Sequence, residues 1–208
     1  ELLVDPGTYR YNGEPSWRRY FKSTSAHNTV TVDGLDQAVQ ETGFIWSNPF
    51  GCRVLRRAEV EAGYLVEAEH DGYRRLPEPV LHRRALLHAA PGVLVVRDSF
   101  SGAGEHDFAL HFHLHPDAAV SREDGWWYIS RGERRIWLTL LDGCHLELLQ
   151  GELDPLLGWY APAYGSKVPA GVLRCRKRGA CRSVSFRTVI GWGAAPDNAW
   201  LDALGGAL

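Results

Sequence analysis

Asp5 and His27, near the start of the chain, are residues of the types that hold metal ions. Carboxylate oxygen and imidazole nitrogen are common zinc ligands, and a loop can draw the two ends of this polar segment together. However, an Asp before Pro-Gly is also ordinary turn chemistry, and a His after Ser-Ala can simply cap a strand. The residues alone therefore leave a metal pair and a turn as alternatives.

Three histidines, His111, His113 and His115, occupy alternate positions in the run 108–115. On a strand such side chains project to the same side, about 6.6 Å apart, and imidazole suits zinc. Three in a row converge poorly on one ion, whereas an exposed sheet face tolerates histidine. We therefore expect a histidine-bearing outer face, opposite an apolar face, rather than a metal site.

The opening polar segment also contains Tyr9, Tyr11 and Tyr20 among cations that include Arg18 and Arg19. A tyrosine can act as general acid or base when cations or a metal lower its pKa from about 10, or it can pack its ring on a sheet. The arginine pair can clamp a carboxylate or sulfate in bidentate fashion, or serve as surface charge.

A second candidate region is the aromatic segment 158–167, which contains Trp159, Tyr164 and Lys167. Such rings either stack on sugars or belong to the core. The segment opens the range 155–196, which has seven Lys or Arg and no acidic residue, and which suits nucleic acid, acidic polysaccharide or a membrane surface as partner. Nucleic acid is disfavoured, because no aromatic residue stands among the cations of 174–182.

The four cysteines follow no CxxC pattern. Cys175 and Cys181 flank a predicted hairpin turn at 176–180 and can pair across it in an oxidising compartment; otherwise the cysteines are buried free thiols. The compartment is not fixed by these residues.

Short apolar or alternating runs separated by Gly and Pro turns predict the fold. Strands are expected at 28–32, 43–46, 54–62, 64–69, 81–88, 93–98, 108–115, 126–129, 136–141, 145–149, 172–175 and 183–190, and a short helix at 198–204. This pattern predicts an all-β protein: a large antiparallel β-sandwich of two stacked sheets with about a dozen strands, forming a single domain over residues 1–208.

Composition is that of an ordinary globular protein, with a net charge of −2 and 45% hydrophobic residues. No run approaches the ~18 apolar residues of a membrane span. The chain has no methionine and begins at Glu1 in an apolar run, so we expect a piece of a longer protein.

An ordered set of motifs resembles a known family. Residues 4–9 (VDPGTY), 19–21 (RYF), 27–30 (HNTV), 32–34 (VDG), 36–37 (DQ) and 164–167 (YGSK) are similar to the C-terminal β domain of heparinase II/III-like polysaccharide lyases. The resemblance implies a β-sandwich behind an N-terminal α/α toroid, which carries the main catalytic Tyr, Asn and His. It also implies β-elimination on an anionic, uronate-containing polysaccharide, and a periplasmic or secreted location, with a cytoplasmic one still open.

The resemblance further implies zinc in the parent protein, held by Asp5, His27 and a histidine that precedes this chain, so zinc should bind weakly or not at all here. It implies that Tyr20 is the catalytic tyrosine lent by this domain, with Tyr9 and Tyr11 as alternatives. The residues expected to contact substrate are Tyr9, Tyr11, Arg18, Arg19, Gln37, Trp159, Tyr164 and Lys167. The alternative function is a non-catalytic carbohydrate-binding or scaffolding module in polysaccharide synthesis or export.

Overall fold

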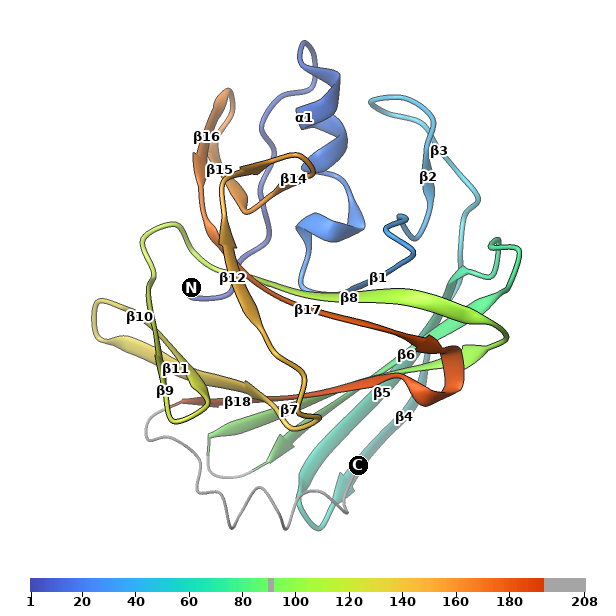
Figure 1. Ribbon diagram of the computed structural model, residues 1–208, viewed down its shortest axis with the longest axis vertical. Coiled ribbons are helices and arrows are strands. Elements are labelled where there is room, and N and C mark those ends of the chain that lie inside the picture. Colours follow the sequence, from blue (N-terminus) through green and yellow to red (C-terminus); the bar gives the residue numbers. More distant parts are fainter. Residues whose placement is uncertain (90–91, 193–208) are drawn as a thin grey trace.

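Two antiparallel sheets form most of the protein, shown in Figure 1 as a computed structural model that describes residues 1–89 and 92–192. The larger sheet has the strand order β4-β5-β6-β7-β18-β11-β10-β9, with bounds Cys52–Val60, Gly63–Tyr73, Val80–Ala89, Val93–Gly102, Ser185–Trp192, Arg134–Leu140, Trp126–Arg131 and Ala119–Glu123. The smaller has the order β1-β8-β17-β12, with bounds Val30–Val32, Glu105–His113, Gly171–Ala180 and Glu147–Gln150. The predicted all-β sandwich is confirmed.

The core lies between these two sheets. The alternation in β8 places Phe108, Leu110 and Phe112 on the inner face, where they are buried in one cluster with Phe100 and Phe186 of the larger sheet. Burying each such side chain contributes roughly 1.5–3 kcal/mol. The two-residue period of the sequence therefore fixes which face of β8 meets the core.

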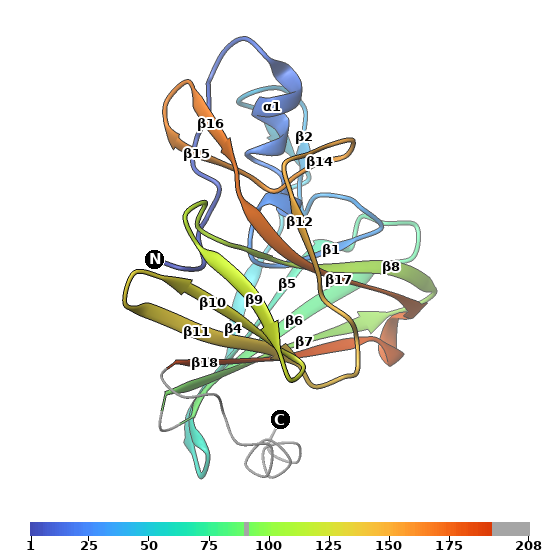
Figure 2. The same ribbon diagram turned by 60° about the vertical axis from the view of Figure 1, so that its left-hand side comes forward.

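A set of short elements covers the opposite face of the smaller sheet, and we call it the cap. It consists of helix α1 (Pro15–Tyr20), the turn η1 (Thr24–Ala26) and the strand pairs β2/β3 (Val39–Gln40, Trp46–Ser47), β13/β14 (Glu152–Leu153, Leu156–Leu157) and β15/β16 (Trp159–Ala163, Ser166–Pro169). Figures 1 and 2 both place α1 and these hairpins on the side away from the larger sheet. The sequence predicted only a loop where α1 lies, although Pro15 in the first turn is a helix-start signal.

The cap overturns the expected exposure of the histidines. His111 and His113 are each only 3% exposed, and the His113 Nε2 lies 2.8 Å from the Ser25 carbonyl oxygen of the cap. Burial lowers the pKa of His113 to about 4, and burial together with the neighbouring His113 lowers that of His111 to about 3. At His111 and His113 the outer face of β8 is thus buried rather than exposed to water.

The cysteine pairing also differs from the expectation. Strand β17 runs straight through 176–180, so Cys175 and Cys181 are separated along an extended strand instead of facing each other across a turn. Cys175 instead forms a disulfide with Cys144, with 6.6 Å between the two Cα atoms. Cys181 is a buried free thiol next to the short helix η2 (Cys181–Ser183), and Cys52 is an exposed one.

No helix among residues 1–89 and 92–192 is long and apolar enough to cross a membrane. The helix predicted at 198–204 lies outside the described residues.

Candidate functional site

The structure brings Asp5 and His27 together at the surface. Oδ1 of Asp5 and Nδ1 of His27 are 2.8 Å apart, and both side chains are partly exposed. Asn28 fixes the chain beside them, because its side chain donates to the Val4 carbonyl at 3.0 Å and accepts the His113 backbone N–H at 2.6 Å. The segments before and after the polar loop are therefore joined next to the pair.

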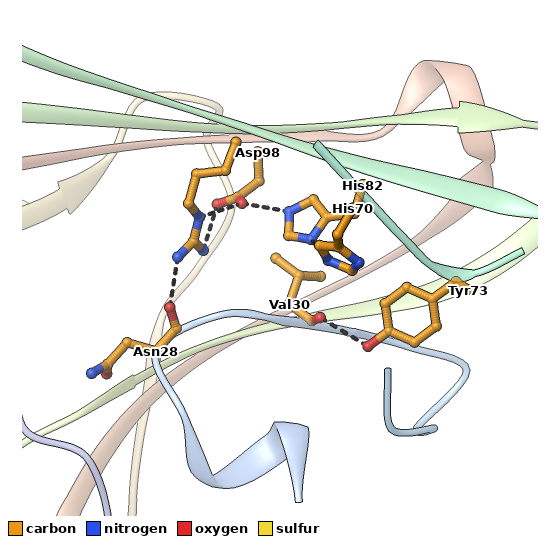
Figure 3. Close-up of polar contacts among 7 residues, drawn as sticks. Asn28, Val30, His70, Tyr73, His82 and Asp98 are labelled. Atoms are coloured by element: carbon orange, nitrogen blue, oxygen red, sulfur yellow. Dashed lines mark hydrogen bonds and ion pairs between the residues drawn. The ribbon is translucent and has the colours of Figure 1, made fainter. Parts of the chain in front are cut away.

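A buried polar chain from the larger sheet reaches the same point (Figure 3). Arg84 donates to the Asn28 carbonyl at 2.6 Å and is paired with the fully buried carboxylate of Asp98 through Nε at 2.7 Å. Oδ1 of Asp98 also lies 2.6 Å from Nε2 of His82, and Nδ1 of His82 lies 2.9 Å from Nε2 of His70. Burial alone would raise the pKa of Asp98, but Arg84 and His82 outweigh it and lower that pKa to about 2, so Asp98 is a carboxylate.

The pair is chemically suited to a metal, but it supplies only part of a site. A tetrahedral zinc ion takes three or four protein ligands, at about 2.0 Å from nitrogen or oxygen. No group of three His, Cys, Asp or Glu side chains within the described ranges is placed to hold a metal ion. Asp5 and His27 therefore fit two corners of a zinc site whose further ligands would come from elsewhere.

Cations and aromatic rings line the groove between α1 and the β2/β3 hairpin. The Gly43 carbonyl accepts hydrogen bonds from Nε of Arg18 at 3.3 Å and from Nζ of Lys22 at 2.9 Å. The Arg18 guanidinium lies 5.0 Å from the ring centre of Tyr11 and 5.6 Å from that of Phe44. The Lys22 ammonium lies 4.5 Å from the ring centre of Trp46, so each cation has cation–π contacts, and neither forms an ion pair with an acidic residue in the part of the chain that the structure describes.

Two pockets lie on either side of the Lys22–Gly43 hydrogen bond. One, of about 350 Å³, is lined by Arg18, Arg19 and Tyr11, and the other, of about 500 Å³, is lined by Lys22, Trp46, Gln37 and His27. Burial, and to a smaller extent the neighbouring Arg18, lower the pKa of Lys22. We call this groove the cationic strip and define it by Tyr11, Arg18, Arg19, Lys22, His27, Gln37, Phe44, Trp46 and Tyr164, whose ring centre is 5.7 Å from that of Tyr11.

The other candidate residues lie in the interior of the cap. Tyr20 is 4% exposed, its hydroxyl accepts the Trp159 backbone N–H at 3.2 Å, and burial raises its pKa to about 12. The Tyr9 hydroxyl donates to Glu14 at 2.8 Å and accepts from Lys167 at 3.0 Å. Trp159 packs edge-on against Trp17, with ring centres 4.9 Å apart. These residues hold the cap together in the described structure.

The sequence did not single out Lys22, Phe44 or Trp46 as site residues. Phe44 and Trp46 belong to an apolar run that predicts a strand, yet both are exposed, at 65% and 40%. The preceding Thr42-Gly43 could have indicated their exposure, because a turn at these residues can place the following aromatic side chains outside the core.

The uneven charge of the 155–196 segment is largely balanced in three dimensions. Acidic residues from other segments pair with Lys167, Arg174, Lys177 and Arg187, and the distances are 2.8–3.6 Å. For these four cations the one-sided field that the sequence suggests is therefore offset in the folded chain.

Comparison with known proteins decides the family. A family model described as heparinase II/III-like, C-terminal, matches residues 1–192. The chain belongs to this family. A search of curated proteins finds no match.

Solved structures show the same fold as this heparinase II/III-like domain. The heparan sulfate lyase HepC from Pedobacter heparinus matches 94% of the chain with a TM-score of 0.69 and 16% identity. A heparinase III gene product matches 92% with a TM-score of 0.67 and 22% identity, and another heparinase III matches 92% with 0.67 and 16%. The chain spans 29%, 28% and 27% of those proteins' lengths, so the match covers one part of each of them.

Proposed function

We propose that this chain is the β-sandwich part of a polysaccharide lyase that cleaves an anionic, uronate-containing polymer by β-elimination, together with a helical toroid of the same parent protein. The cationic strip carries the proposal. Its guanidinium groups can bind carboxylate or sulfate in bidentate fashion, and its exposed rings can stack on sugars. The solved relatives named heparan sulfate lyases and heparinase III support a polymer of this class.

Within this proposal, Tyr11 is the tyrosine best placed to exchange a proton with a substrate. It is 51% exposed and lies in the strip beside Arg18, whereas the Tyr20 and Tyr9 hydroxyls are buried and already hydrogen bonded. Proton transfer requires the donor or acceptor within hydrogen-bond reach of the substrate. Tyr20 would then act by holding the Trp159 backbone.

We further propose that Asp5 and His27 are two zinc ligands in the parent protein. Their donor atoms are adjacent and partly exposed, so a third ligand can approach them. Zinc titrations followed by calorimetry should show weak or no binding to this chain and at least tenfold tighter binding to the parent. Stoichiometric, tightly held zinc in this chain alone would contradict the proposal.

Lyase activity is tested in the full-length parent protein by following unsaturated uronate products with heparan sulfate and other uronate polymers. Arg18→Lys should raise KM, because lysine lacks the planar fork, while Arg131→Lys, in an exposed pair with Asp117, serves as the matched control. Tyr11→Phe should lower kcat more than Tyr20→Phe does. Formation of no unsaturated product from any of these polymers would refute the lyase assignment.

A non-catalytic carbohydrate-binding module is the second candidate. It is favoured by the burial of Tyr9 and Tyr20, which leaves the strip richer in binding groups than in proton-transfer groups. Polymer binding that depends on Arg18 in a parent protein without lyase activity would identify this alternative. The Cys144–Cys175 disulfide supports an exported protein for either function.

A further inference from the structure

A separate pocket of about 260 Å³ lies on the outer face of the smaller sheet, between β8, β17 and the β13/β14 hairpin. It shares no lining residue with the two pockets of the cationic strip. Its floor follows from strand register: Ala109 pairs with Thr31 on one side and Arg176 on the other, and His111 pairs with Arg174. The small side chain of Ala109 leaves the space between these longer neighbours open.

The two arginines of this pocket differ in whether they already form an ion pair. Nε of Arg174 is 2.8 Å from Glu147, so that guanidinium is already paired. Arg176 is exposed and forms no ion pair with any residue that the structure describes. The exposed Asp107 also lines the pocket. The pocket therefore offers one free cation for an acid group and one carboxylate that can accept hydroxyl hydrogen bonds.

His111 adds an unpaired polar atom. Its side chain lines the pocket and is only 3% exposed, and Nδ1 has no hydrogen-bond partner among the described residues. Buried polar atoms are nearly always paired, so an orphan in a pocket wall marks a place for a ligand group or a bridging water. An uncharged imidazole can pair with a hydroxyl.

The remaining wall is apolar and comes from Pro155, Leu156 and Leu157. Such a surface suits the C–H face of a sugar ring, and the volume is just below the ~300 Å³ at which small-molecule sites begin. The pocket therefore has room for one sugar unit and not for an extended chain.

We propose that this pocket binds a single uronic acid residue of the polysaccharide, at a site separate from the cationic strip. Arg176 binds the carboxylate, Asp107 and His111 serve the hydroxyl groups, and Leu156 and Leu157 contact the ring. The inference rests on the proposed function for its choice of polymer. A second site of this kind would hold the polymer while another segment lies in the strip.

The test uses the ¹⁵N-labelled 208-residue chain titrated with a glucuronate-containing tetrasaccharide, its carboxyl-reduced form and inorganic sulfate. Amide shifts should change at Ala109 and Arg176, and Kd should weaken at least tenfold in Arg176→Ser and in the pocket-filling Ala109→Leu. Arg182→Ser removes the same charge outside the pocket and should change Kd less than threefold. The carboxyl-reduced sugar should also bind at least tenfold more weakly.

Thermal melting first establishes that each variant is folded. Shift changes confined to Tyr11 and Lys22 would refute this inference and leave the proposed function standing. Equal losses in Arg176→Ser and Arg182→Ser, or saturation by sulfate alone with no added shift from the sugar, would also refute it. Absence of binding to the folded chain refutes it as well, whereas lyase activity of the parent protein is measured separately through unsaturated products.

Discussion

Replacing Asp98 by asparagine tests whether the buried chain of Figure 3 anchors the candidate metal pair to the larger sheet. The carboxylate is 0% exposed and receives hydrogen bonds from Arg84 at 2.7 and 3.0 Å, with His82 at 2.6 Å. Asp98→Asn keeps the shape but leaves the Arg84 charge without a counter-ion. Removing one partner of a buried ion pair costs about 3–5 kcal/mol.

The amide oxygen of asparagine still accepts one hydrogen bond, so we expect the lower end, about 3 kcal/mol, in urea unfolding at pH 7 followed by tryptophan fluorescence. Asp117→Asn is the matched control, because it makes the same change in an exposed pair with Arg131 and should cost less than about 1 kcal/mol. A double-mutant cycle that combines Asp98→Asn with Arg84→Met should show that their effects on the free energy of unfolding are not additive. Equal costs for Asp98→Asn and Asp117→Asn would refute the anchoring role.

The pH dependence of the same residue has a definite sign. Its pKa falls from 3.8 in the unfolded chain to about 2 in the folded one, so its stabilisation of about 2 kcal/mol is present above pH 3.8 and is lost as pH drops towards 2. The wild-type protein should therefore lose this contribution to the free energy of unfolding at acid pH, whereas Asp98→Asn, which lacks the carboxylate, should not. A constant difference between the two proteins down to pH 2 would contradict the assignment.

Three further predictions concern other parts of the fold. Burial lowers the pKa values of the half-buried His70 and of the buried His111 and His113 from 6.5 to about 3–4, so the unfolded chain binds more protons than the folded one. The free energy of unfolding should therefore fall as pH drops from 6.5 towards 4, by up to about 1.4 kcal/mol per pH unit and histidine, and unchanged urea midpoints across this range would contradict the prediction. Non-reducing peptide mapping should find Cys144 linked to Cys175, and Cys144→Ser should cost about 3–4 kcal/mol for a loop of this length; a Cys175–Cys181 peptide would contradict the structure. Gly158→Ala should lower the free energy of unfolding by at least about 1 kcal/mol more than Gly132→Ala, as measured in thermal melts. Both glycines have positive φ, but of the two only Gly158 has backbone close to the position of an added Cβ, with the Ala170 oxygen 2.8 Å away. Equal losses in the two variants would contradict this steric argument.

The β-sandwich could be predicted because the signals for its strands and hairpins lie in residues that are close together in the sequence. Two-residue alternation in 108–115 and turns at Gly63 and Gly92 determine strands and hairpins without reference to distant segments, and the observed β4/β5 and β6/β7 pairs follow them. The same alternation correctly separated the faces of β8. It could not show that the second face would also be covered, since the covering segments are far away in sequence.

The Cys144–Cys175 pair and the contacts that assemble the strip were not predictable for a related reason, although the sequence did single out several strip residues, such as Tyr11 and Arg18, one by one. Disulfide partners depend on which strand lies beside which loop, and Cys175 is brought to Cys144 by the pairing of β12 with β17. Likewise Tyr11 and Tyr164 are 153 positions apart, and their contact depends on how the β15/β16 hairpin folds against the start of the chain. The spacing of residues along the sequence cannot predict contacts between segments that are so far apart.

The cap shows how the smaller sheet can support the proposed binding groups as well as the core. Its buried tyrosines, Tyr9 and Tyr20, fasten α1 to the β15/β16 hairpin through Lys167 and Trp159. Because these contacts use the hydroxyl groups internally, the exposed rings and cations of the strip are held by packing beneath them. Residues at the centre of the most recognisable motif therefore position the site, while the groups available to a ligand lie at its margins.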